Sequence, residues 1–172
     1  MEYFYHLLPA SLKGNILYPL STLKDIHPIL AKSYIKSYKD RTSLLNKQIK
    51  ILDCVWQDVL FCSAVNPILI FSALDLLGLL DENPPTILQF PITALRNTDF
   101  CFYQEISGKH IFDKETVAAY QEEFTLPVET VKYFASCIKS KESPLIFASV
   151  PHILIKGSLD IKLSKELHYK RF

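Results

Sequence analysis

Residues 58–78, DVLFCSAVNPILIFSALDLLG, join a strand pattern, a proline and a helix pattern in one apolar run. Asn66 offers a side-chain acceptor to the amides that follow it, and Pro67 suits the first helical position, where no amide donor is needed. Gly78 suits the left-handed residue just beyond a helix end. The run therefore predicts a strand that leads directly into a well-delimited helix, and its apolar surface requires a sizeable core.

Strand and helix patterns follow one another irregularly along the rest of the chain. Strand patterns cover residues 2–8, 16–20, 86–92, 100–106, 144–150, 152–156 and 159–163. Residues 49–56 and 58–63 also have strand patterns and are consistent with one strand or two. Helix patterns run from Ser21 or Thr22 to about Tyr38 with a restart or kink at Pro28, from Asp113 to about Glu123, and over 127–139. This order is too irregular for a doubly wound sheet. We predict an α+β fold, with a mixed or antiparallel sheet of about six strands and helices packed around it.

Composition and length indicate one globular domain. The chain has 172 residues, of which 49% are hydrophobic and 22% charged, and no repeat or Gly/Pro/Ser-rich linker divides it. We therefore predict a single domain over residues 1–172, whose last few residues form a basic tail. The formal charge of +1 gives no general attraction to nucleic acid or to an anionic membrane.

The cysteines and the N-terminus indicate a reducing compartment. Cys54, Cys62, Cys101 and Cys137 lie far apart without CxxC pairing or zinc-ligand spacing, so we expect buried thiols and no metal site. The N-terminus lacks a signal-peptide pattern, and the apolar run at 68–80 is too short to span a bilayer. These features predict a soluble cytoplasmic protein, in the producing cell or in a target cell if it is secreted as an effector.

The chain lacks the sequence signatures of several enzyme classes. There is no GxGxxG, GxxxxGK[ST], GxSxG or HExxH motif, and no serine has a base at motif spacing. His6 lies in an aromatic strand pattern, where a buried imidazole is either a hydrogen-bonded core group or a ligand contact. Glu142 precedes the strand pattern 144–150, where a carboxylate either stabilises a developing cation or is solvated surface. His152 alternates with apolar neighbours, which indicates a solvent-facing position.

The order of these segments resembles that of mono-ADP-ribosyltransferases of the DarT toxin type. The resemblance covers most of the chain and is carried by YFYHLL, a capped helix, a stretch with Arg41, DVLFCSAVNPILI, TILQFPI with FCFYQ, KESPLIFASVP and HILIKGSLDI. Tyr5 and His6 match the family's first motif, in which the histidine binds the ribose of NAD. Glu142 matches the glutamate that carries the reaction. Leu8 and Val65 stand where that family has a threonine and an arginine.

The resemblance implies an ADP-ribosyltransferase-like fold and NAD as the substrate. Glu142 would stabilise the ribose cation formed when the nicotinamide bond breaks. Tyr5, Phe4 or Tyr18 would provide a stacking wall for nicotinamide. The amides at the helix start around Asn66 are available to an anionic ligand.

Two functions from different classes follow from the resemblance. The first is a bacterial toxin or effector that uses NAD to modify a macromolecule, either a nucleic-acid base or a protein side chain, with an antitoxin or regulatory protein as a further partner. The alternative is a noncatalytic binding module of toxin–antitoxin, phage-defence or effector type with a degraded site. Leu8 and Val65 favour the alternative, and no residue cluster recommends a hydrolase or nuclease.

Overall fold

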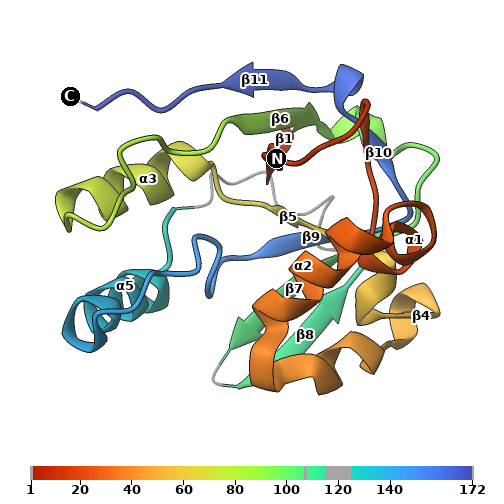
Figure 1. Cartoon of the computed structure of the whole chain (residues 1–172), viewed down its shortest axis with the longest axis horizontal. Helices are drawn as coiled ribbons and strands as arrows, with labels where there is room; N and C mark the ends of the chain where they lie inside the picture. The colour runs from red at the N-terminus through yellow and green to blue at the C-terminus, as the bar shows by residue number, and fades with distance from the viewer. Residues whose placement is uncertain (1, 107, 115–124, 172) are drawn as a thin grey trace.

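A seven-stranded antiparallel sheet runs through the molecule (Figure 1). The computed structural model describes residues 2–106, 108–114 and 125–171. Within them the strand order is β11-β6-β1-β5-β9-β7-β8, and each neighbouring pair is antiparallel. The strands of this sheet are β1 (Tyr3–Leu7), β5 (Val59–Ser63), β6 (Ile87–Pro91), β7 (Phe100–Ile106), β8 (Lys109–Asp113), β9 (His152–Lys156) and β11 (Lys165–Leu167).

Two short ribbons and several helical segments surround the sheet. The ribbons pair β2 (Ile16–Leu17) with β10 (Leu159–Asp160), and β3 (Gln48–Ile49) with β4 (Cys54–Val55). The α-helices are α1 (Leu20–Ile26), α2 (Pro28–Tyr38), α3 (Pro67–Leu76) and α5 (Val128–Ser140), and the 3₁₀ segments are η1 (Lys39–Asn46), η2 (Lys50–Leu52), η3 (Trp56–Asp58), η4 (Ile92–Leu95) and η5 (Ile161–Leu163). The predicted α+β class is confirmed.

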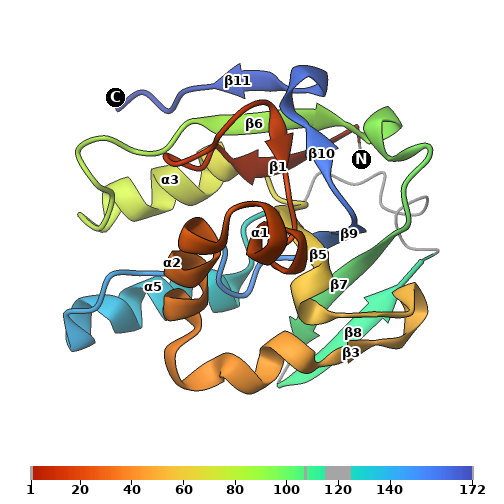
Figure 2. The same ribbon diagram turned by 45° about the vertical axis from the view of Figure 1, so that its right-hand side comes forward.

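The helices form two groups in space. Figures 1 and 2 show α3 and α5 together at one end of the molecule, and α1 with α2 in front of β5. The α2 helix restarts at Pro28 and ends at Tyr38, as predicted. No helix of the described residues is both long and apolar enough to cross a membrane. The helix predicted from Asp113 to about Glu123 lies, beyond Lys114, outside the described residues, and Asp113 itself ends β8.

Side-chain alternation along β1 divides the core between the two faces of the sheet. Phe4 is fully buried in a cluster on one face, where its ring stacks on Phe90 with the centroids 5.2 Å apart. Tyr5, the next residue, lies in a separate cluster with Phe71 of α3 and Phe134 of α5. The helices α3 and α5 therefore cover the Tyr5 face of β1, and His6 belongs to the opposite face with Phe4.

The strand–proline–helix unit forms as its sequence predicts. The Oδ1 atom of Asn66 accepts a hydrogen bond of 3.0 Å from the Ile68 amide, and Pro67 occupies the first turn of α3. Gly78 has a φ of +67°, and the Leu79 amide beyond it donates to the Leu74 carbonyl at 2.8 Å. These bonds satisfy backbone groups that a helix leaves unpaired at its ends.

The C-terminal segment is attached to α3 by polar contacts. The Arg171 guanidinium lies 3.1 Å from the Asp75 carboxylate and donates to the carbonyls of Leu80 and Asp81. The hydroxyl of Tyr169 also donates to Asp75, at 3.3 Å. Residues 165–171 therefore continue along the sheet edge to the end of α3.

The Asn66 cap gives a direct test of this local structure. Replacing Asn66 with Ala removes the acceptor for the Ile68 amide, so we expect the free energy of unfolding to fall by about 1 kcal/mol. Urea denaturation of the two proteins measures this difference. The matched control is Asn83→Ala, because Asn83 is exposed and forms no hydrogen bond within the described part of the chain. Equal losses in the two variants would contradict the capping role.

Candidate functional site

The sheet divides between β1 and β5. These strands share one register pair, Tyr5 with Ser63, whereas β1 and β6 share five pairs. Continued pairing would bring Leu7 opposite Phe61. Instead His6 and Leu7 on one side, and residues 59–61 on the other, line a cavity of about 380 Å³. The two strands therefore separate beyond Tyr5, and the opening between them is the candidate site.

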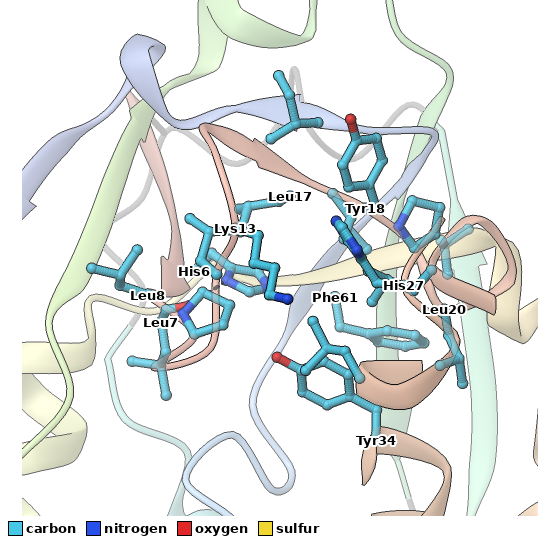
Figure 3. A pocket seen from close by; sticks show the side chains of 18 of the residues that line it. His6, Leu7, Leu8, Lys13, Leu17, Tyr18, Leu20, His27, Tyr34 and Phe61 are labelled. Atoms are coloured by element: carbon cyan, nitrogen blue, oxygen red, sulfur yellow. Dashed lines mark hydrogen bonds between the residues drawn. The ribbon is translucent and has the colours of Figure 1, made fainter. Parts of the chain in front are cut away.

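The walls of this cavity are mainly aliphatic and aromatic. Besides β1 and β5, the loop between β1 and β2, β2 itself, α1 and α2 contribute side chains to the walls (Figure 3). A volume of about 380 Å³ falls within the range of small-molecule sites, which are typically apolar with a few polar groups. The polar side chains on the lining are His6, Lys13, Tyr18, His27, Tyr34 and Tyr38.

No acidic side chain lines the cavity within the described residues. The same residues contain no group of three or more His, Cys, Asp or Glu side chains that could hold a metal ion. The chemistry of the site therefore depends on basic, hydroxyl and aromatic groups.

His6 presents a hydrogen-bond acceptor to the cavity. Its Nδ1 atom lies 2.6 Å from the Leu7 carbonyl oxygen, and because a carbonyl only accepts, Nδ1 carries the proton. Burial lowers the pKa of His6, against a smaller opposing effect of this hydrogen bond, so the ring is neutral at pH 7. A neutral ring protonated at Nδ1 leaves a lone pair on Nε2. Figure 3 shows the ring among the side chains that face the cavity.

The structure separates the predicted site residues. His6 and Tyr18 line the same cavity, whereas Tyr5 and Asn66 are not among its lining residues. Tyr5 points to the other face of β1, where burial raises the pKa of its phenol. The Asn66 side chain caps α3.

Glu142 follows a helix instead of opening a strand. Its amide donates to the Cys137 carbonyl at 3.1 Å, just after Lys141, which ends α5 with a φ of +57°. Its side chain is exposed, and the Ser140 hydroxyl donates to its Oε2 atom at 3.3 Å. Glu142 is not among the residues that line the His6 cavity.

The strand predicted over residues 144–150 is wrong, because this segment forms turns. Its apolar residues Ile146 and Phe147 pack against the cluster that contains Tyr5, so they are partly buried without strand pairing. Ser149 has a φ of +58°, which is incompatible with an extended strand. Pro151 follows and has no amide hydrogen to donate.

His152 is half-buried, although its sequence pattern indicates a solvent-facing position. Its ring lies 5.8 Å from that of Tyr103, 6.0 Å from Phe61 and 6.4 Å from Phe147, measured between centroids. Its Nδ1 atom is buried without a hydrogen-bond partner in the described chain. Burial lowers the pKa of His152 to about 4, against a weaker opposing interaction with the Val150 backbone. The predicted solvent-facing position is therefore wrong, since aromatic rings from other elements enclose the imidazole.

Comparisons with known proteins give one loose structural likeness. No protein-family profile matches the chain, and no curated protein matches it. The solved structure of Thermosipho africanus DarTG in complex with ADP-ribose is similar with a TM-score of 0.41 and 11% sequence identity. The match covers 96% of this chain and 43% of that chain, so the chain spans less than half of its length.

The enclosed His152 predicts a pH dependence of stability. Its pKa is about 4 in the folded protein against an ordinary value of 6.5, so the unfolded chain takes up a proton that the folded protein excludes. Stability is therefore lost as the pH falls from about 6.5 to 4, by up to roughly 3 kcal/mol at pH 4. His152→Leu should lose less stability over this interval in urea titrations at several pH values.

The exposed His168 supplies the control for this experiment. His168→Leu should keep the pH dependence of the parent protein, because its imidazole lies largely in solvent. If the free energy of unfolding changes with pH in the same way for the parent and for His152→Leu, His152 is not the group that causes the loss of stability at low pH.

Proposed function

We propose that this chain binds NAD or an NAD-derived nucleotide in the His6 cavity and acts as a binding module without transferase activity. The observation that carries the proposal is the composition of the cavity beside the divided sheet. It combines the His6 acceptor and aromatic walls with a lining that has no carboxylate among the described residues. These groups suit the binding of a nucleotide better than the breaking of its glycosidic bond.

Each part of the cavity has a role in this proposal. A ribose hydroxyl donates to Nε2 of His6, which is the remaining acceptor of the neutral ring. A planar base packs among the aromatic side chains of Phe61, Tyr18 and Tyr34, which line the same space. The aliphatic lining lowers the local polarity and so strengthens these polar contacts.

The absence of a carboxylate among the described lining residues is the reason for proposing binding without transfer. Breaking the nicotinamide bond of NAD produces positive charge on the ribose, and a fixed negative group lowers that barrier. The position where the toxins that the sequence resembles have an arginine holds Val65, which is fully buried in the cluster with Tyr5. Leu8 replaces the threonine of the first motif.

Calorimetry with NAD and with ADP-ribose tests the binding proposal. The parent protein should bind at least one of them, and His6→Leu should weaken that binding roughly 3- to 10-fold, because it removes one hydrogen-bond acceptor while keeping an apolar side chain. His168→Leu, in the exposed C-terminal segment, should leave the affinity unchanged. If neither NAD nor ADP-ribose binds at millimolar concentration, the proposal is refuted.

The second candidate is an ADP-ribosyltransferase that uses Glu142 and modifies a nucleic-acid base or a protein side chain. One observation favours it: the loop after Glu142 packs near the division of the sheet. Phe147 in this loop contacts His152, and His152 pairs with Ser63, the β5 residue that also pairs with Tyr5. A toxin of this kind would also have an antitoxin or another regulatory partner.

Nicotinamide release from NAD separates the two candidates. The proposed binding module should release no nicotinamide above the uncatalysed rate, either with the parent protein or with Glu142→Gln. Release by the parent that falls at least 100-fold in Glu142→Gln, measured by chromatography with protein and nucleic-acid acceptors present, would establish the transferase instead.

A further inference from the structure

We infer that Lys13 and His27 form an anion-binding pair at the His6 cavity, and that the cavity therefore selects phosphorylated nucleosides over uncharged ones. This inference rests on the proposed nucleotide-binding function. The phosphate contact would involve Lys13, which lies outside the segments that carried the family resemblance, and His27, which lies within the capped-helix segment.

Lys13 and His27 reach the cavity from different parts of the chain. Lys13 lies on the loop between β1 and β2, and His27 is the residue between α1 and α2. Figure 3 shows both side chains directed towards the space that also holds the rings of His6 and Tyr34. Two basic groups from separate elements therefore face one partly open cavity.

Neither basic side chain is neutralised by a neighbour. Within the described residues, the Lys13 ammonium and the His27 ring form no hydrogen bond or ion pair. The lining of the cavity contains no described carboxylate that could balance them. Because the walls are mostly apolar, the field of a nearby cation is screened less than it would be in bulk water. An anionic group on the ligand would supply the missing partner.

The loop that carries Lys13 is anchored beside the cavity. The Leu12 amide donates to the Pro9 carbonyl at 3.0 Å, and both Leu8 and Leu12 pack against the core cluster on the Phe4 face. Gly14 follows with a φ of +77°, a conformation that L side chains rarely adopt, and allows the chain to turn into β2. These contacts hold the backbone at Lys13 close to the cavity while its long side chain stays exposed.

The cavity thus has two polar zones with different chemistry. The neutral His6 ring offers an acceptor that suits a hydroxyl donor, whereas Lys13 and His27 offer donors that suit an anion. A 5′-phosphorylated nucleoside places ribose hydroxyls and a phosphate within one small molecule. An uncharged nucleoside satisfies only the His6 zone.

Calorimetry with matched ligand pairs tests this selectivity. The probes are adenosine with AMP, and nicotinamide riboside with nicotinamide mononucleotide, at low and moderate KCl concentrations. The parent protein should bind the phosphorylated member of at least one pair about tenfold more tightly, and this preference should shrink as salt increases. Lys13→Met should remove most of the preference and His27→Gln part of it, with little change for the nucleosides.

Lys132→Met is the matched control, because Lys132 is an exposed lysine on α5 that does not line the cavity. It should retain the full phosphate preference. Equal binding of nucleosides and nucleotides, unchanged in Lys13→Met, would overturn the anion-binding pair while leaving nucleotide binding at His6 intact. No binding of any of the four probes, of NAD or of ADP-ribose would overturn both this inference and the proposed function.

Discussion

The single register pair between Tyr5 and Ser63 is the constraint on which the rest of the site depends. Each of the two strands is fully paired on its other edge, β1 with β6 and β5 with β9, over five register pairs in each case. The strands can therefore separate beyond Tyr5 without losing their place in the sheet. Side chains of α1, α2 and the β1–β2 loop then line the opening, which becomes a cavity of about 380 Å³.

Alternation along β1 then decides which residues reach that space. His6 faces the cavity, whereas Tyr5 and the capped start of α3 at Asn66 belong to packing on the other face. The neutral state of His6 follows from its burial and from its bond to the Leu7 carbonyl. On our proposal, a site built in this way accepts hydroxyl donors at its strand edge and an anion where Lys13 extends over the opening.

Local sequence signals predicted the elements that are determined locally. The Asn66–Pro67 start and Gly78 end of α3 follow from backbone hydrogen bonds within a few residues, and the prediction of this helix is confirmed. Residues 144–150 and His152 depend on contacts between distant segments, and both predictions failed. Hydrophobicity alone does not distinguish a strand from a turn segment whose apolar residues are partly buried. Nor does it distinguish an exposed strand position from one enclosed by aromatic rings. The division of the sheet, and with it the role that we infer for Lys13, also arises from pairing across the fold.

An NMR titration of the isotope-labelled protein with NAD tests the central claim most directly, because it locates the ligand and does not depend on catalysis. Binding at the divided sheet predicts chemical-shift changes concentrated at the imidazole of His6, the amide of Leu7, and residues 59–61 on the opposite strand. The signals of Asn66 and Glu142 should move little, since neither residue lines this cavity. Shift changes centred on Asn66 and Glu142, with His6 unaffected, would contradict the account.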